Sequence, residues 1–278
     1  MTPTVIVLTY NSGLSLSATL SSLEGLTDDI HIVDSGSVDD TASIAERFGA
    51  HFVRHPFESY GLQRNWAIDN ITCKHSWQLH LDSDEQVSTL LREEIIGLTV
   101  EGAVDGYFLP RYLKFMGRLL RHNLAPTWHM RLFRNRQGRC EQRHYDQHFI
   151  CNGPTARLRH EIVDDIRMPL TEWTLRHNRW SDAEVRELTL GSGYESVQPR
   201  MRGNIVERKR SLKSLYNRAP LFIRAFALFF IRYFGGGFLD GKEGLIFCVL
   251  QTLWFRFLID AKLYELRLAA PPLDAAER

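Results

Sequence analysis

The chain has 278 residues, of which 44% are hydrophobic, so it is long enough for one large domain with an extension or for two small domains, each with a buried core. Its formal net charge of +1 excludes a general electrostatic attraction to nucleic acid, and we expect no nucleic-acid partner. Four scattered cysteines, and an N-terminus without a charged and then apolar leader, predict a cytoplasmic protein in a reducing compartment.

The first eighty residues alternate between short β-branched runs and helical periodicity. Strands are predicted at residues 4–8, 30–33, 51–54 and 76–81. Helices are predicted between them at residues 15–25, with Ser15 as the N-cap and Gly25 at the end, and at 40–49 and 59–70. This βαβαβαβ order predicts an α/β fold with a mainly parallel, Rossmann-like sheet flanked by helices.

Polar clusters follow three of the predicted strands. They read "TYNS" (9–12), "DSGSVDDT" (34–41) and "DSDE" (82–85). In parallel sheets, ligands bind beyond the carboxyl ends of the strands, so the clusters predict a binding site there. The same residue types also favour plain turns, and that alternative stays open.

The three carboxylates of "DSDE" repel one another unless something compensates their charge. A divalent cation such as Mg²⁺ or Mn²⁺ takes oxygen ligands, commonly one or two carboxylates together with substrate phosphates, and Asp82 and Asp84 fit that demand. Asp34 could accept a hydrogen bond from a base imide or a ribose hydroxyl, or it could simply form an Asx turn. Neither G-x-G-x-x-G nor G-x-x-x-x-G-K-[ST] occurs in the sequence, so no dinucleotide-binding Rossmann site or P-loop is indicated.

The later pattern predicts strands at residues 106–115 and 129–134, and then helices at 171–180 and 181–190. The second of these helices is expected to open with a capping box formed by Ser181 and Glu184.

Beyond residue 198 the chain becomes basic and then apolar. Between residues 200 and 218, seven basic residues stand against the single acid Glu207: Arg200, Arg202, Arg208, Lys209, Arg210, Lys213 and Arg218. The apolar runs at 225–231 and 244–255 are each too short to span a bilayer, but they suit a segment that lies on an anionic membrane surface. The competing interpretation is that they only pack under the sheet or form a dimer interface.

Four stretches, "TVIVLTYN", "IVDSGSVDDT", "GLQRNWAI" and "LHLDSDE", resemble in order and spacing the successive motifs of the family 2 inverting glycosyltransferases of the GT-A fold. The later "MRLFR", "YDQHF", "RHNRWSDAEV" and "FLDGKEGLIF" resemble bacterial members that build lipopolysaccharide core or exopolysaccharide. The likeness therefore extends over most of the chain.

The resemblance implies roles for individual residues. The nucleotide-binding residues would be Thr9, Tyr10, Asn11, Asp34, Ser37, Asp39, Arg64, Asn65, Asp82 and Ser83. The cofactor would be Mn²⁺ or Mg²⁺, held by Asp84, Asp82 and His177, with Asp84 as the direct ligand. Contacts to the diphosphate or the acceptor would come from Arg131, Gln147 and Arg179.

An inverting transfer also needs a base that deprotonates the acceptor hydroxyl. In related core glucosyltransferases a Glu follows a His in a "VHEHL"-like stretch, whereas this chain reads "YDQHF", with Gln147 at the Glu position. Because Gln cannot act as a base, Asp146 is the predicted catalytic base, with Glu141 as the second candidate.

Two domains are therefore expected, a GT-A catalytic domain over residues 1–198 and a basic, amphipathic helical extension over 199–278. The expected function is metal-dependent inverting transfer of a sugar from a nucleotide diphosphate sugar, a UDP-sugar, to a hydroxyl of a cell-envelope saccharide, either lipopolysaccharide core or a lipid-linked exopolysaccharide intermediate. The expected location is peripheral, on the inner face of the cytoplasmic membrane, and a homodimer is left open. Two alternatives remain: a polyprenyl-phosphate glycosyltransferase, which needs no base, and a catalytically silent sugar-nucleotide or glycan-binding membrane scaffold.

Overall fold

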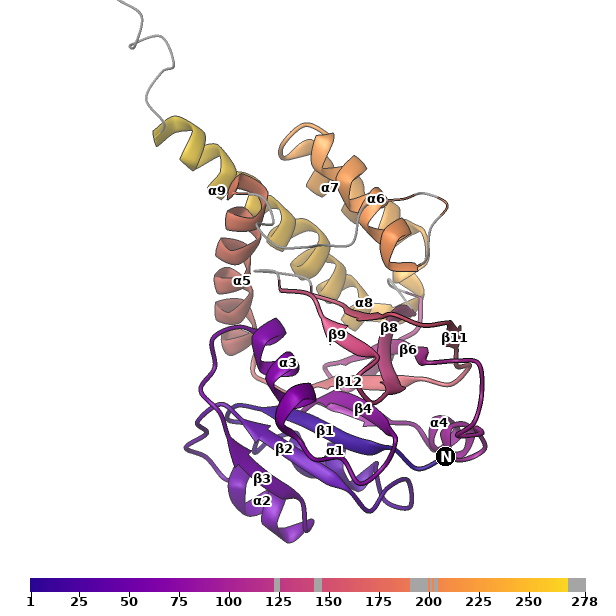
Figure 1. Cartoon of the computed structure of the whole chain (residues 1–278). Coiled ribbons are helices and arrows are strands. Elements are labelled where there is room, and N and C mark those ends of the chain that lie inside the picture. The colour runs from indigo at the N-terminus through magenta and orange to yellow at the C-terminus, as the bar shows by residue number, and fades with distance from the viewer. Residues whose placement is uncertain (123–125, 143–146, 191–199, 201, 203–204, 270–278) are drawn as a thin grey trace, which may run out of the picture. The chain divides into compact units, whose positions relative to one another are not determined.

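A computed structural model describes residues 1–122, 126–142, 147–190, 200, 202 and 205–269. Contacts divide the chain into two units, Met1–Met168 and Pro169–Arg278, and each is described by itself (Figure 1). The domain boundary expected at 198/199 falls outside the described residues. Helix α5 (Leu170–Leu190) groups with the later helices, so the α/β unit ends at Met168.

Four parallel strands form one half of the sheet. They are β1 (Thr4–Thr9), β2 (Ile30–Asp34), β3 (His51–Arg54) and β4 (Trp77–Asp82), in the order β3-β2-β1-β4. Thr9 pairs with Asp34, and Leu8 pairs with Asp82, so the carboxyl ends of β1, β2 and β4 lie side by side. The four predicted strands and their parallel arrangement are confirmed.

The other half of the sheet is mixed. Strand β8 (Thr127–Arg134) runs antiparallel to β4, and β6 (Gly106–Phe115) runs antiparallel to β8. The sheet continues through β12 (Ile162–Ile166) to β5 (Glu85–Val87), while β7 (Arg118–Leu120) and β11 (Thr155–Arg157) pair with β6. Strands β9 (Gly138–Cys140) and β10 (Phe149–Cys151) form a separate antiparallel pair. The strands predicted at 106–115 and 129–134 are confirmed.

Alternate residues of each strand point to opposite faces of the sheet, and side chains on both faces of the parallel half are buried. Val5 and Val7 join one core with side chains of α1 (Leu16–Ser21), α2 (Thr41–Arg47) and α4 (Thr89–Ile96). Ile6 and Val33 join a smaller core on the other face with Ala67 of α3 (Tyr60–Asn70). Burial on both faces explains why these strands read as continuous apolar runs.

Helix α1 differs from its predicted form. It ends at Ser21, before Gly25. Ser15 is the N-cap residue, as predicted, but its side chain makes no capping hydrogen bond to the N–H groups of the helix. The expected kind of cap occurs at α3, where Ser59 accepts a hydrogen bond from the Leu62 N–H (3.2 Å).

The two helices predicted at 171–180 and 181–190 are one continuous helix, α5. The predicted capping box is wrong, because the Ser181 hydroxyl donates to the carbonyl of Asn178 (2.6 Å) inside the helix. The Glu184 carboxylate instead pairs with Lys213 and Arg256 (2.9 Å each). The local pattern of Ser181 and Glu184 predicted a helix start, but in the folded chain Glu184 forms ion pairs with distant residues and the helix is continuous there.

The remaining helices of the second unit are α6 (Ile205–Arg218), α7 (Ile223–Phe234), η1 (Gly237–Asp240), α8 (Gly241–Cys248), the π-helical turn η2 (Val249–Trp254) and α9 (Phe255–Ala269). A buried ion pair between Arg224 and Asp260 joins α7 to α9. The stretch Gly237–Ala269 is long and apolar enough, by length and composition alone, to cross a membrane. The apolar run at 244–255, which is too short by itself to span a bilayer, is therefore part of a longer helical segment.

Candidate active site

The three polar clusters meet at the carboxyl edge of the parallel strands, as predicted. The Thr9 hydroxyl donates to the Asp34 carboxylate (2.8 Å), which joins the ends of β1 and β2. The Ser12 hydroxyl donates to that of Ser83 (2.8 Å), which joins the loop after β1 to the turn after β4. Residues that are far apart in the sequence thus share one edge.

Asp34 organises the loop that follows β2. Its carboxylate is fully buried and accepts hydrogen bonds from the N–H groups of Gly36 (2.9 Å) and Ser37 (2.8 Å) and from the Ser37 hydroxyl (2.5 Å). Ser37 in turn accepts a bond from the N–H of Asn11 (2.7 Å). Asn11 has a φ of 48°, in the left-handed region that Asn tolerates better than most residues. The structure gives Asp34 an organising role in this loop, and its direct bond to a base remains a prediction.

Asp39 holds the loop after β1 to the start of α2. Its carboxylate accepts hydrogen bonds from the N–H of Gly13 (2.8 Å) and from the N–H (3.1 Å) and hydroxyl (2.5 Å) of Thr41. Burial would raise the pKa of Asp39, but these hydrogen bonds outweigh it and lower the pKa, so Asp39 is ionised at neutral pH. The neighbouring apolar side chains of Tyr10 and Val38 are exposed, by 64% and 92%. Exposed apolar surface beside ordered polar groups suits a flat ligand such as a nucleobase.

Asp82 lies between two arginines. Its carboxylate oxygens accept bonds from Arg64 of α3 (2.7 Å) and Arg131 of β8 (2.8 Å). Burial would raise the pKa of Asp82, but the charges of Arg64 and Arg131 prevail and lower it. The predicted nucleotide-site residues Arg64 and Asp82 and the predicted phosphate contact Arg131 are therefore in direct contact.

Glu85, the last acid of "DSDE", points into the protein. It is fully buried, accepts a hydrogen bond from Arg131 (2.6 Å) and accepts another from the N–H of Asp82 (3.0 Å). Arg111 of β6 lies 3.6 Å from the same carboxylate. We call Asp82, Glu85, Arg64, Arg111 and Arg131 the ion network. The positive charges of its arginines offset the repulsion between the neighbouring carboxylates of Asp82 and Glu85 in the "DSDE" cluster.

The turn between β4 and β5 carries Ser83 and Asp84, both half-buried. The Ser83 carbonyl accepts a bond from the Thr19 hydroxyl (2.8 Å), and the Asp84 carbonyl accepts one from the N–H of Asp165 (2.8 Å). The backbone of the turn is thus fixed from both sides. Asp82 precedes Ser83 and Asp84 follows it, and their carboxylates are the hard oxygen ligands that Mg²⁺ and Mn²⁺ take.

Asn65 anchors α3 to β9. Its side-chain amide donates to the carbonyl of Cys140 (2.9 Å) and accepts from the Cys140 N–H (2.8 Å). Helix α3 also lies close to the backbone of Glu141 at Gly61, where an added Cβ would be 2.4 Å from the Glu141 carbonyl oxygen. The predicted contact of Asn65 with the diphosphate stays a prediction, because the structure shows its amide used for this junction.

The two base candidates differ in what the structure describes. Glu141 is buried, and its carboxylate accepts a hydrogen bond from the N–H of His148 (2.9 Å) and lies 3.3 Å from the His148 ring. Gln147 is half-buried, and Asp146 lies outside the described residues. Glu141 thus fixes the position of His148.

His177 and Arg179 belong to α5, in the second unit. The His177 ring is buried and stacks on Trp173 (3.5 Å), with Nδ1 2.8 Å from the Trp173 carbonyl and Nε2 3.0 Å from the Gln251 side-chain oxygen. Burial lowers the pKa of His177 to about 4. These contacts are those of a neutral packing residue, and the metal role of His177 remains a prediction, as does the role of Arg179.

Two members of the ion network were not predicted from the sequence. Glu85 was noticed only as part of an acidic cluster, and Arg111 lies in a strand with no motif around it. The signal available for Glu85 was its place after a two-residue turn, which reverses the chain into β5.

Residues 4–167 match the model of glycosyl transferase family 2, so the chain belongs to this family and is an enzyme of the glycosyltransferase class. The predicted GT-A fold is also confirmed, as a mainly parallel sheet flanked by helices and followed by a helical C-terminal part.

Proteins with similar sequences are also described as glycosyltransferases. An uncharacterized glycosyltransferase of Rickettsia bellii is 27% identical over 98% of this chain and 89% of the relative. One of Rickettsia conorii is 33% identical, but over only 41% of this chain and 38% of the relative. A lipopolysaccharide core biosynthesis glycosyltransferase of Rhizobium meliloti is 23% identical over 93% of this chain and 90% of the relative.

Among solved structures, Staphylococcus aureus TarS in complex with UDP-GlcNAc gives a TM-score of 0.48 and 15% identity over 96% of this chain and 92% of that one. Glucosyl-3-phosphoglycerate synthase from Mycobacterium tuberculosis, in complex with Mn²⁺, UDP and glucosyl-3-phosphoglycerate, gives a TM-score of 0.33 and 21% identity over 40% of this chain and 44% of that one. At these scores neither structure assigns a donor or a metal to this chain.

The ion network predicts that loss of Arg131 destabilises the protein far more than loss of Arg139, an arginine outside the network. We expect Arg131→Met to lower the free energy of unfolding by about 3–5 kcal/mol, because it leaves the buried Glu85 carboxylate without its closest charge partner. The matched control is Arg139→Met, which removes a half-exposed pair with Asp69 and should cost no more than about 1 kcal/mol. Urea unfolding at neutral pH measures both variants, and equal midpoints for the two would contradict a stabilising network.

Proposed function

We propose that the protein transfers a sugar with inversion from a UDP-sugar to a hydroxyl of a cell-envelope saccharide, with Mn²⁺ or Mg²⁺ held by Asp82 and Asp84. The observation that carries the proposal is Asp82 between Arg64 and Arg131 at the edge where three strand-end loops meet. Membership in family 2 supports the reaction class, and the lipopolysaccharide core relative supports the acceptor class.

The residues divide the work of the transfer. The acceptor hydroxyl oxygen attacks the anomeric carbon, the bond from that carbon to the diphosphate oxygen breaks, and the base takes the hydroxyl proton. Negative charge then grows on the diphosphate, where Arg64 and Arg131 supply fixed positive charge. A bound divalent cation would add Lewis-acid stabilisation of the same leaving group. Because Asp82 already binds both arginines, its first task is to orient them, and Asp84 is the better candidate for the direct metal ligand.

The donor side of the proposal is tested by nucleotide binding. We expect UDP to raise the melting temperature of the wild type in the presence of Mn²⁺, since a ligand at about a hundred times its dissociation constant stabilises a protein by about 2.7 kcal/mol. Asp84→Asn should lose the metal-dependent part of the shift and its turnover, while Asp69→Asn, which changes an exposed acid, should keep both. GDP, CDP and dTDP serve as comparison ligands. Wild-type behaviour of Asp84→Asn would refute the metal assignment.

The acceptor side depends on the base. We expect Asp146→Asn to reduce turnover with a lipopolysaccharide core oligosaccharide by about 10²–10⁴-fold while the Mn²⁺-dependent UDP shift persists, because a general base contributes only to the chemical step. Gln147→Ala is the neighbouring control, with a far smaller expected loss. If Asp146→Asn keeps its rate and a polyprenyl phosphate is the better acceptor, the polyprenyl-phosphate alternative is correct. Absence of turnover with both acceptors would favour the silent scaffold.

We further propose that the helical unit binds an anionic membrane surface. Apolar side chains on α7 are exposed at helical spacing, namely Ile223, Phe226, Phe230 and Phe234, by 47–67%. Arg208 and Lys209 on α6 are exposed as well, whereas Arg210 is buried and is not counted among the membrane-binding cations. Aromatic anchors together with nearby cations are typical of segments that lie in the interface of an anionic leaflet. A lipid-linked acceptor would be reached there.

Vesicle sedimentation tests this surface. Replacing Arg208 and Lys209 by Ala should weaken binding to phosphatidylglycerol vesicles by about 2 kcal/mol, or ~30-fold, at low salt, and much less at high salt. Phe230→Asp with Phe234→Asp should weaken binding at any salt, and Phe57→Asp, an exposed Phe in the first unit, is the control. Unchanged sedimentation would contradict a membrane role, and concentration-dependent sedimentation without vesicles would indicate a dimer interface. Extraction from membranes by alkaline carbonate separates a peripheral helix from one that crosses.

A further inference from the structure

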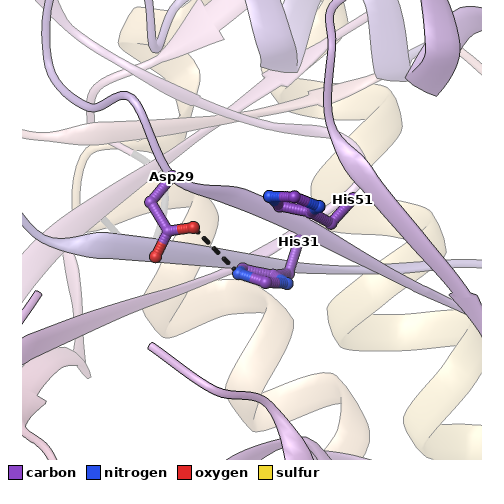
Figure 2. A group of neighbouring side chains, drawn as sticks. All are labelled: Asp29, His31 and His51. Carbon is purple, nitrogen blue, oxygen red and sulfur yellow. Dashed lines mark hydrogen bonds and ion pairs between the residues drawn. The ribbon is translucent and has the colours of Figure 1, made fainter. Parts of the chain in front are cut away.

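The amino-terminal edge of the parallel strands carries a second polar cluster, at the opposite end from the candidate active site. Among the described residues, Asp29, His31 and His51 form one group whose ligand atoms all lie within 4.8 Å of one another. Figure 2 shows the three side chains together, with the two rings stacked and Asp29 bonded to His31. His31 lies three residues before Asp34 on β2, about 10 Å along the strand.

We propose that Asp29, His31 and His51 form a binding site for a transition-metal ion of the Zn²⁺ class, separate from the oxygen-lined site at Asp82 and Asp84. Two imidazoles and one carboxylate are a ligand set that suits Zn²⁺, Co²⁺ or Ni²⁺ better than Mg²⁺. Solvent would complete the coordination beside His51, which is exposed. The proposal does not depend on the proposed transferase function.

Strand geometry brings the ligands to one face. Asp29 and His31 are two residues apart in extended chain, and His31 pairs directly with His51 on β3, so all three side chains project from the same side of the sheet. The ring centroids of His31 and His51 are 4.7 Å apart, and Asp29 Oδ1 lies 3.0 Å from His31 Nε2. A tetrahedral zinc holds its ligand atoms about 3.4 Å apart. The ligand atoms now lie within 4.8 Å of one another, and a rotation of the exposed His51 ring would bring its nitrogen toward the other two.

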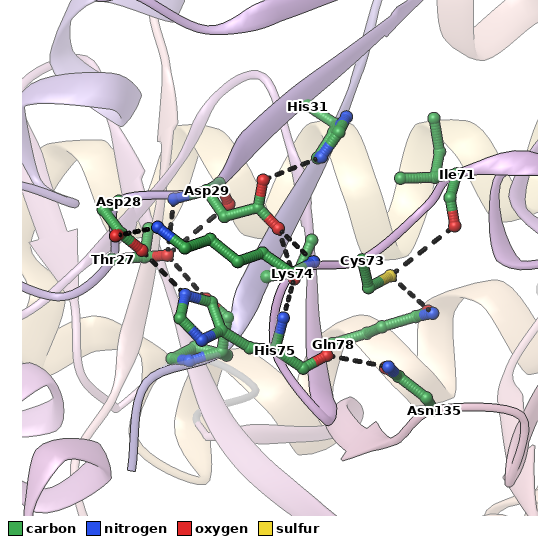
Figure 3. Close-up of polar contacts among 12 residues, drawn as sticks. Thr27, Asp28, Asp29, His31, Ile71, Cys73, Lys74, His75, Gln78 and Asn135 are labelled. Carbon is green, nitrogen blue, oxygen red and sulfur yellow. Dashed lines mark hydrogen bonds and ion pairs between the residues drawn. The ribbon is translucent and has the colours of Figure 1, made fainter.

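The surroundings leave the ligands ready for a metal. The other carboxylate oxygen of Asp29 accepts hydrogen bonds from the Thr4 hydroxyl (2.6 Å) and the Lys74 N–H (2.8 Å). These bonds fix the group and leave Oδ1 turned toward His31, and Figure 3 shows Asp29 between Lys74 and His31. Such outer hydrogen bonds orient metal ligands in known sites.

Asp28, next in sequence, is not a member of the site. Its carboxylate pairs with Lys74 and with His75 (2.7 Å to Nε2), as Figure 3 shows. The cluster therefore has a buried carboxylate directed at two imidazoles and a separate exposed acid that is already neutralised.

A metal at this site would tie β3 to β2. Strand β3 is four residues long and lies at the edge of the sheet, where it pairs with β2. His31 and His51 would become a cross-strand clamp at its start, and the same strand β2 ends at Asp34 in the candidate active site. The metal would thus have a structural role, since it stabilises the edge of the sheet.

The test is metal binding by the full chain without a histidine tag, after chelation and dialysis. We expect one equivalent of Zn²⁺ in a competition titration, visible d–d absorption of a tetrahedral type with Co²⁺, and a higher melting temperature with Zn²⁺. His51→Asn should weaken Zn²⁺ binding by at least ~100-fold, because changes to the outer shell alone cost about 10- to 100-fold, and His31→Asn should do the same. Since His51 is exposed, its variant tests the site even if His31→Asn unfolds.

Two controls separate this site from others. His160→Asn removes a partly exposed histidine whose Nδ1 lies 2.9 Å from Glu94, outside the cluster, and should keep wild-type zinc affinity. Asp84→Asn should also keep it while losing the metal dependence of UDP binding. Zinc binding that is absent in the wild type, unchanged in His51→Asn, or lost in Asp84→Asn would overturn the proposal.

Discussion

The contact between Arg131 and the two carboxylates of Asp82 and Glu85 is the constraint on which the candidate active site depends. Backbone pairing between β4 and β8 runs from Trp77 with Arg134 to Leu79 with Leu132, and Arg131 is the next residue of β8. The arginine thus lies where the two strands separate. Its side chain joins the parallel half of the sheet to the mixed half at the point where the backbone ladder ends.

The position of Arg131 also explains how the chain accommodates three acids within residues 82–85. Burying a charge is costly unless it is paired and hydrogen-bonded, and Glu85 satisfies both conditions with Arg131 and the Asp82 N–H. Glu85 therefore anchors the turn from inside, while Asp82 and Asp84 remain at the edge. The motif thus contains one buried structural acid, Glu85, which holds the backbone of Asp82 in place at the start of the turn.

The parts of the fold that follow from local periodicity could be predicted from the sequence, and the parts that depend on distant partners could not. The parallel strands and the three polar loops were predicted because β-branched runs and strand-end turns are local signals. Ser181 was misjudged as a cap because Glu184, its supposed capping partner, instead pairs with Lys213 and Arg256. Likewise, nothing within a short window shows that Asp82 would bind Arg131, a partner 49 positions away.

The two edges of the parallel half of the sheet carry different ligand chemistries, and the difference bears on how one chain could use two metals. At the carboxyl edge, where β4 ends, Asp82 and Asp84 offer oxygens only, a set that would suit Mg²⁺ or Mn²⁺ but would compete poorly for Zn²⁺. At the amino end, the paired imidazoles of His31 and His51 would capture Zn²⁺ first. Trace zinc would then be drawn to a place where it stabilises the sheet edge, and the oxygen site would be left to the abundant cation that exchanges with each nucleotide. Separation between the two edges of the parallel strands would thus give each metal its own task without a selective cage at either edge.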